Sequence, residues 1–199
     1  MIKTAQHAIL SHCLTLMQHQ GMSHALLEQA SVQAGYAPLY YYTVFDTLED
    51  VAHGLMEALD EQMLAACQDV CATIPSIRTR IYTIITRRIA LAKPHISAYR
   101  QLHYFMARPC HVSFATACHW RTADHIWRLA GDASTDFNYY TKRGLLLAVY
   151  CTTWLYWLQD SSAEQRDTDG FLKRRIDNAL SVGRFKQKIS GFFKTASLN

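Results

Sequence analysis

Two Cys–His pairs have the clearest potential to hold a metal ion in this chain, Cys110–His111 and Cys118–His119. The six residues between the pairs match no standard zinc spacing. The sequence also lacks the Glu-x-x-His motif of di-iron bundles, a glycine-rich phosphate loop and a nucleophile elbow. We therefore expect no metal site, no catalytic residue and no enzymatic activity.

The elements that would position a site are helices. The chain has 199 residues, of which 50% are hydrophobic, with eight glycines and four prolines, and this composition favours long helices over many short strands. The six cysteines show no paired framework. We expect an all-α protein of about nine to ten helices. Its predicted parts are a degenerate helix-turn-helix-like region at 1–46, a helical core at 47–182 and an amphipathic helix at 183–199.

Helix boundaries are marked most clearly in the first third of the chain. Ala34 and Gly35 predict a turn, and a third helix is expected to begin near Pro38. Thr47 is the expected N-cap of the next helix, which Pro75 ends. Apolar residues at three- and four-residue spacing give this helix a buried stripe: Leu48, Val51, Leu55, Leu59 and Met63.

A run of sixteen residues between Arg143 and Asp160 carries no charge. As a helix it has no solvent face, so we expect it to be central and buried on every side. It spans roughly 24 Å, which is short of the ~30 Å hydrocarbon core of a bilayer. The residues that face inward by spacing, and could therefore line an internal cavity, are Leu102, Phe105, Met106, Leu146, Leu147, Tyr150, Trp154, Leu158 and Leu180. An ordinary packed core would show the same pattern, so spacing leaves both alternatives open.

Charge is distributed unevenly. No Lys or Arg occurs from Thr4 to Ile77, where there are eight acidic residues. The stretch AGYAPLYYYTVFDTLEDV nevertheless resembles the helix-turn-helix of TetR-type regulators, with matching structural positions at Ala34, Gly35, Tyr42, Phe45, Thr47, Glu49 and Asp50. Because DNA affinity depends on cations that contact phosphates, we expect no binding of nucleic acid. The tyrosines then serve to pack the fold.

The last segment of the chain is amphipathic and cationic. Its aromatic and aliphatic residues are Phe185, Ile189, Phe192 and Phe193, at i, i+4, i+7 and i+8. Lys186, Lys188 and Lys194 lie mostly off that stripe. This pattern indicates contact with an anionic membrane surface. The alternative is a final helix that packs on its own domain.

The block AGDASTDFNYYTKRGLLLAVYCTTWLYWLQDSS, continued by DTDGFLKRRIDNAL, resembles the ubiquinone-biosynthesis lipid-binding family, coenzyme Q nine in words. The resemblance implies a TetR-like helical fold without DNA binding, and an isoprenoid or quinone lipid bound in the core. It implies presentation of that lipid at the membrane to a demethoxyubiquinone hydroxylase of the coenzyme Q seven type. The alternative function is a TetR-family, ligand-responsive transcriptional regulator.

The resemblance also places a partner-binding patch at the start of the long helix. It would comprise Ile126, Asp136, Asn138, Tyr139, Tyr140 and Arg143. Tyr and Arg suit an interface, because they are enriched at hot spots. Inward packing of Tyr140 remains an alternative, as does helix capping by Asp132 and Asp136.

We further expect a homodimer. The first residues show no import segment, so we expect a bacterial form in the cytoplasm, peripheral on the inner membrane.

Overall fold

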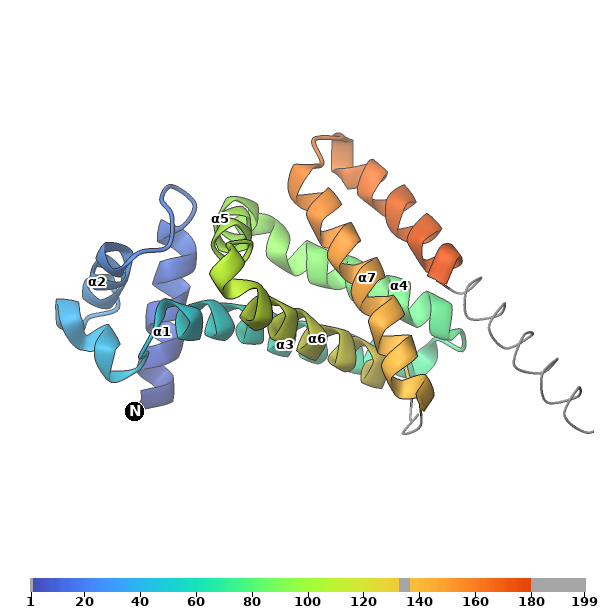
Figure 1. Ribbon diagram of the computed structural model, residues 1–199, viewed down its shortest axis with the longest axis horizontal. Coiled ribbons are helices and arrows are strands. Elements are labelled where there is room, and N and C mark those ends of the chain that lie inside the picture. The colour runs from blue at the N-terminus through green and yellow to red at the C-terminus, as the bar shows by residue number, and fades with distance from the viewer. Residues whose placement is uncertain (1, 133–136, 180–199) are drawn as a thin grey trace, which may run out of the picture. The chain divides into compact units, whose positions relative to one another are not determined.

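The structure is a computed structural model that describes residues 2–132 and 137–179. These residues form helices and connecting turns without a strand (Figure 1), which confirms the all-α prediction. The α-helices are α1 (Ile2–Leu16), α2 (His24–Gln33), α3 (Leu48–Thr73), α4 (Ile77–Ala92), α5 (Ile96–Met106), α6 (Val112–Leu129) and α7 (Phe137–Gln159). Short 3-10 helices are η1 (Pro38–Thr43), η2 (Lys93–His95), η3 (Pro109–His111) and η4 (Ala163–Gln165), and residues 166–179 are again helical.

The chain divides into two compact units. Unit 1 contains residues 1–67 and 87–122, and unit 2 contains residues 68–86 and 123–199. The helices α3, α4 and α6 contribute residues to both units. The predicted boundaries at 46/47 and 182/183 stay predictions.

The turn after α2 has the expected geometry. Gly35 has a φ of 83°, a left-handed conformation that glycine adopts without steric cost. The amide of Tyr36 donates to the carbonyl of Ser31 at 2.9 Å, and the amide of Gly35 donates to the carbonyl of Val32 at 3.0 Å. These two hydrogen bonds form a Schellman motif, which ends α2 where the sequence predicts the turn.

The helix predicted to begin near Pro38 is a 3-10 helix of six residues, η1. Its amides bond three residues back, from Tyr40 to Ala37 at 2.9 Å and from Val44 to Tyr41 at 3.0 Å. Tyr41 is buried, and its hydroxyl lies 3.2 Å from Nδ1 of His24 on α2. This inward anchoring favours a short, tight turn over a continuing α-helix.

The N-terminus of α3 is closed by a reciprocal pair of hydrogen bonds. The amide of Asp50 donates to the hydroxyl of Thr47 at 3.2 Å, and the amide of Thr47 donates to the Asp50 carboxylate at 2.8 Å. This arrangement is a capping box with aspartate at its third position, and it confirms the predicted N-cap. Most of the predicted stripe is buried, whereas Leu48 at its start is half-buried.

A charged cluster that the sequence analysis missed lies in the core of unit 1. Arg88 on α4 donates to the carboxylate of Asp60 on α3 at 2.6 Å, and Arg121 on α6 donates to it at 3.1 Å. The hydroxyl of Thr122 donates to the same carboxylate at 2.9 Å. Both Asp60 and Arg88 are buried. The cluster therefore joins three helices through one carboxylate.

Unit 2 is held together by side chains of α4. Arg78 forms an ion pair of 2.5 Å with Asp177, and the hydroxyl of Tyr82 donates to Asp169 in the helical residues 166–179. Arg80 donates to the carbonyl of Ala130 at 3.0 Å, just after α6. Gly131, with a φ of 89°, lies in a left-handed conformation just after the end of α6.

Candidate functional site

The candidate site is built on α7, the helix that contains the uncharged run. Its inner face is buried and consists of Leu146, Val149, Tyr150, Thr153, Trp154, Trp157 and Leu158. Its outer face is exposed at Ala148, Thr152, Leu155, Tyr156 and Gln159. The expectation of burial on every side is therefore wrong. Uncharged residues such as alanine and threonine tolerate water, so a lack of charge does not require burial.

Aromatic rings dominate the inner face of α7. The rings of Trp154 and Trp157 lie 4.8 Å apart at 53°, and those of Tyr150 and Trp154 lie 6.0 Å apart at 44°. The indole nitrogen of Trp157 is buried and has no hydrogen-bond partner among the described residues. An indole N–H can only donate, so this mainly apolar face carries a donor that no group in the described part of the chain satisfies.

The residues predicted to line a lipid cavity belong to both units. Leu102, Phe105 and Met106 are buried on α5 in unit 1. In unit 2, α7 carries Leu146, Tyr150, Trp154 and Leu158, all buried, and Leu147, which is half-buried. Leu180 lies outside the described residues. A shared cavity stays a prediction.

The predicted partner patch is partly buried. Tyr140 is 65% exposed, whereas Ile126 on α6 and Arg143 on α7 are buried inside unit 2. Asn138 and Tyr139 lie in α7, but their side chains are outside the described part of the structure, as is the whole of Asp136. Of the described patch residues, Tyr140 alone is available for direct contact with a partner.

Arg143 has a structural environment that the sequence analysis missed. Its guanidinium lies 2.5 Å from the carboxylate of Asp124 on α6 and 3.4 Å from that of Asp132. Lys142 pairs with Asp132 at 2.7 Å, and the carbonyl of Lys142 accepts a 2.9 Å hydrogen bond from the Trp127 indole. Asp132 therefore takes part in ion pairs. These contacts fix the first turns of α7 against the end of α6.

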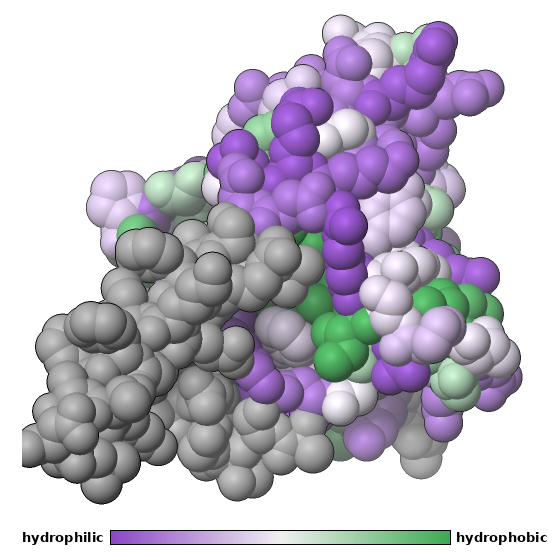
Figure 2. All heavy atoms as spheres, turned by 90° about the vertical axis from the view of Figure 1, so that its right-hand side faces the viewer, coloured by the Kyte–Doolittle hydropathy of each residue, from purple (hydrophilic) through white to green (hydrophobic). Residues whose placement is uncertain are grey.

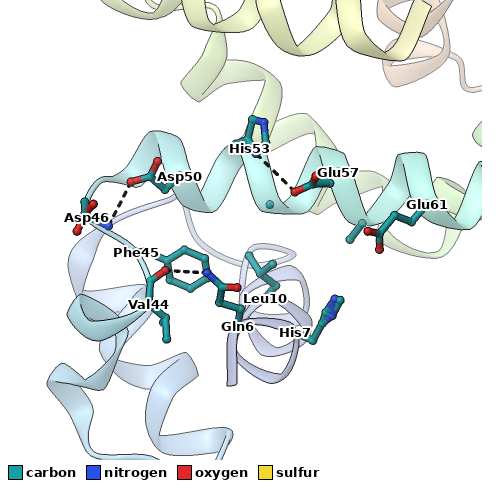
Figure 3. A pocket seen from close by; sticks show the side chains of 12 residues that line it. Gln6, His7, Leu10, Val44, Phe45, Asp46, Asp50, His53, Glu57 and Glu61 are labelled. Carbon is teal, nitrogen blue, oxygen red and sulfur yellow. Dashed lines mark hydrogen bonds and ion pairs between the residues drawn. The ribbon is translucent and has the colours of Figure 1, made fainter. Parts of the chain in front are cut away.

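Unit 1 contains a polar cleft of about 350 Å³ (Figure 3). Gln6 on α1 donates to the carbonyl of Val44 at 3.0 Å across this cleft. On α3, His53 lies 3.7 Å from Glu57. The wall of α3 also carries Asp50 and Glu61. None of the residues predicted to bind lipid lines this cleft, and its acidic walls do not suit an isoprenoid tail.

The Cys–His pairs do not form a ligand set. Cys110 is exposed and Cys118 is buried. Within residues 2–132 and 137–179, no group of three or more His, Cys, Asp or Glu side chains is arranged to hold a metal ion.

None of the helices in the described ranges is both long and apolar enough to cross a bilayer. Figure 2 shows one side of the molecule, where hydrophilic residues cover most of the described surface and hydrophobic residues gather in small groups. The residues predicted to contact a membrane lie outside the described residues: Phe185, Lys186, Lys188, Ile189, Phe192, Phe193 and Lys194.

The order of helices and the helix-turn-helix-like start define a TetR-like fold. The chain is similar to the crystal structure of a TetR transcriptional regulator from Nitrosomonas europaea, with a TM-score of 0.70 and 18% identity, over 88% of this chain and 97% of that one. At this identity the likeness concerns the fold alone.

The family model that matches is COQ9, over residues 112–183, which contain α6, α7 and the residues that follow. The mitochondrial protein coq9 of Dictyostelium discoideum, named as a probable ubiquinone biosynthesis protein, is 26% identical over 91% of this chain and 61% of its own length. The human mitochondrial ubiquinone biosynthesis protein COQ9 is 32% identical over 53% of this chain and 33% of its own length. Residues 112–183 of this chain match the COQ9 family model, and its fold is TetR-like, which confirms the predicted resemblance.

The chain thus spans between about a third and three fifths of the length of these relatives. Their names contradict the expected location in a bacterial cytoplasm and point to mitochondria. That expectation relied on the first residues of a sequence that covers only part of its relatives, so those residues carry no information on targeting.

Proposed function

We propose that this chain is an accessory protein of ubiquinone biosynthesis that binds an isoprenoid or quinone lipid and presents it at a membrane surface to a demethoxyubiquinone hydroxylase. The observation that carries the proposal is the COQ9 match over residues 112–183, because this stretch includes the aromatic inner face of α7. The relatives that share it are named ubiquinone biosynthesis proteins. In this proposal the chain supplies binding and positioning, and the hydroxylase supplies the chemistry.

The lipid part of the proposal is supported by the inner face of α7. An isoprenoid tail needs an apolar wall, and a quinone ring needs few polar contacts at defined positions. Tyr150, Trp154 and Trp157 supply apolar aromatic surface. The indole N–H of Trp157, which has no hydrogen-bond partner among the described residues, is a suitable donor for a quinone oxygen.

The hydroxylase part is supported by the start of α7. Tyr140 is exposed there, and tyrosine gives large contact area at a low cost in conformational entropy. Arg143 lies one turn further on and is fixed by Asp124 and Asp132. Tyr140 is therefore presented from a rigid base.

The membrane part rests on the sequence of residues 183–199. The last sixteen residues contain Arg184, Lys186, Lys188 and Lys194 with no acidic residue. Each cation near an anionic surface contributes about 1 kcal/mol of binding free energy. Phe192→Ser together with Phe193→Ser should abolish flotation with anionic vesicles and leave the lipid content of the protein unchanged.

A fluorescence titration tests the lipid proposal directly, because quinones quench nearby tryptophans. We expect a short-tailed ubiquinone to quench the full chain saturably at one equivalent. Trp154→Phe with Trp157→Phe should remove most of this quenching. Trp120→Phe, at a position outside unit 2, is the matched control and should leave it unchanged. Linear, non-saturating quenching that is equal in all variants would mean that the chain has no quinone site.

A TetR-type regulator remains the alternative function. It requires cations at the DNA-binding surface, whereas no Lys or Arg occurs between Thr4 and Ile77. Salt-sensitive binding to duplex DNA would favour that alternative.

A further inference from the structure

Three large apolar side chains are exposed within residues 32–42. Val32 at the end of α2 is 54% exposed, and Leu39 and Tyr42 in η1 are 59% and 53% exposed. Tyr36 and Tyr40 lie between them in the sequence. Their half-buried rings stack, with centroids 4.6 Å apart and an angle of 11° between the ring planes. We name these five residues the N-terminal apolar patch. Single exposed apolar residues are ordinary, but several exposed apolar side chains on α2 and η1, which pack on each other, indicate an interaction surface.

The N-terminal apolar patch is rigidly supported. His24 stacks on Tyr42 at 5.9 Å and 24°, and its Nδ1 lies 3.2 Å from the hydroxyl of the buried Tyr41. The Schellman motif at Gly35 fixes the path of the chain between α2 and η1. A surface held in this way loses little conformational entropy when a partner binds.

An acidic cleft of about 320 Å³ adjoins the patch. His24 connects the two, because it lines the cleft and its ring stacks on Tyr42 of the patch. The cleft carries two carboxylates, of which Glu49 pairs with His111 at 2.9 Å. Asp46 has no ion-pair partner within the described part of the chain. One cation, Arg108, also lines the cleft, and its guanidinium lies over the ring of Phe105 at 5.6 Å.

We propose that the N-terminal apolar patch docks a partner protein whose contacting surface carries an aliphatic or aromatic side chain flanked by Lys or Arg. The apolar side chain packs on Leu39 and Tyr42, and a flanking cation reaches Asp46 in the cleft. Two other occupants are disfavoured by charge. Nucleic acid and anionic lipid both require several cations, whereas Arg108 is the single Lys or Arg among the residues of the patch and the cleft. The N-terminal apolar patch shares no residue with the proposed lipid and hydroxylase sites, and the adjoining cleft shares only Phe105 with the residues predicted to line the lipid cavity.

Two matched synthetic peptides test the proposal with the full chain. The first has leucine and tryptophan between lysines, and the second has glutamate in place of each lysine. Fluorescence anisotropy at physiological salt should show micromolar binding of the lysine peptide and no binding of the glutamate peptide. Leu39→Ser with Tyr42→Ser should weaken binding of the lysine peptide by about tenfold or more. Tyr104→Ser is the matched control, since Tyr104 is 61% exposed on α5 outside the patch, and it should bind as the parent chain does.

Leu39→Lys provides a second variant that keeps the tyrosines in place. Its added cation should repel the lysine peptide and weaken binding by a similar factor. Equal binding to the parent chain and to both variants would overturn the proposal, as would failure of the parent chain to bind. A dimer that is lost on Leu39→Lys, measured by sedimentation, would identify a second copy as the occupant instead. Lipid content should be unchanged in every variant. Loss of peptide binding therefore tests the docking surface, whereas an absence of bound lipid would count against the proposed function.

Discussion

Arg88 donates a hydrogen bond of 2.6 Å from Nη1 to Oδ1 of Asp60, and both side chains are buried inside unit 1. Taking two charges out of water is costly, so the pair is tolerable only with further hydrogen bonds to the carboxylate. Thr122 and Arg121 provide them. The pair therefore connects α3 to α4 and α6 at a position that a hydrophobic pattern would assign to ordinary core.

Removing one partner of this pair should destabilise the chain strongly. We expect Arg88→Met to lower the free energy of unfolding by about 3–5 kcal/mol, because the Asp60 carboxylate then loses its main cation. Asp60→Leu combined with Arg88→Met should recover much of that loss, since both fully buried charges are removed and the remaining cation, Arg121, is partly exposed. Urea denaturation measures both. A double variant that is less stable than Arg88→Met would contradict this account.

Arg143 and Arg128 give a matched comparison around a second carboxylate. Both pair with Asp124, at 2.5 Å and 2.7 Å, but the side chain of Arg143 is 2% exposed and that of Arg128 is 68% exposed. Arg143→Ala should cost about 3–5 kcal/mol of unfolding free energy. Arg128→Ala should cost less than about 1 kcal/mol, because water screens an exposed pair. Similar losses for the two variants in urea denaturation would show that burial does not control the strength of these pairs.

The capping box of α3 should contribute less to the free energy of unfolding than the buried ion pairs do. Thr47→Ala removes the hydroxyl that accepts from the Asp50 amide, so it should cost about 1 kcal/mol of unfolding free energy. Thr47→Ser keeps that oxygen and should remain within a few tenths of the parent value. Thermal or urea denaturation distinguishes the two. An alanine variant as stable as the serine variant would mean that the box does not contribute.

His119 predicts a pH dependence. Burial, and next the nearby positive charge of Arg88, lower the pKa of His119 from 6.5 to about 4. The unfolded chain therefore binds a proton between pH 6.5 and 4 that the folded chain does not bind. The stability contribution of the neutral imidazole is complete above pH 6.5 and is lost as the pH falls towards 4. His119→Gln should flatten the dependence of unfolding free energy on pH in this window, and an unchanged slope would contradict the shift.

Tyr140 tests the hydroxylase surface. Because it is exposed, Tyr140→Ser should leave the melting temperature within about 1–2 °C of the parent chain, while it weakens binding to the hydroxylase by about tenfold. Surface-immobilised hydroxylase and a dissociation constant for each chain give the measurement. Tyr104→Ser is again a suitable control, since Tyr104 is comparably exposed on α5. Equal weakening by both substitutions would rule out a specific role for Tyr140.

Local signals in the sequence were sufficient for much of the fold. Thr47 and Asp50 close α3, Gly35 ends α2 and Gly131 ends α6, and each depends on chemistry within a few residues. The stripe of α3 was predictable for the same reason. The resemblance over the block that begins at Ala130 likewise pointed to the family whose model matches residues 112–183.

Features that depend on distant residues were missed. Asp60 lies in register with Met56 and Met63 on the buried face of α3, but its burial requires Arg88, which is 28 residues away. Arg143 was assigned to a partner surface for a similar reason, since Asp124 is not apparent from helical spacing. The run from Gly144 to Gln159 was expected to have no solvent face, although Ala148 and Thr152 are exposed. The 3-10 helix η1 carries Tyr41, whose contact with His24 joins residues 17 positions apart in the sequence.

The central claim is that this chain carries an isoprenoid or quinone lipid. The most direct measurement is to extract the purified full chain with organic solvent and to identify and quantify the lipids by mass spectrometry. The account predicts a near-stoichiometric isoprenoid or quinone that Trp154→Phe with Trp157→Phe depletes and Trp120→Phe does not. A chain that contains no such lipid, and that also fails to bind a short-tailed ubiquinone, would contradict the claim and make the inner face of α7 an ordinary packed core.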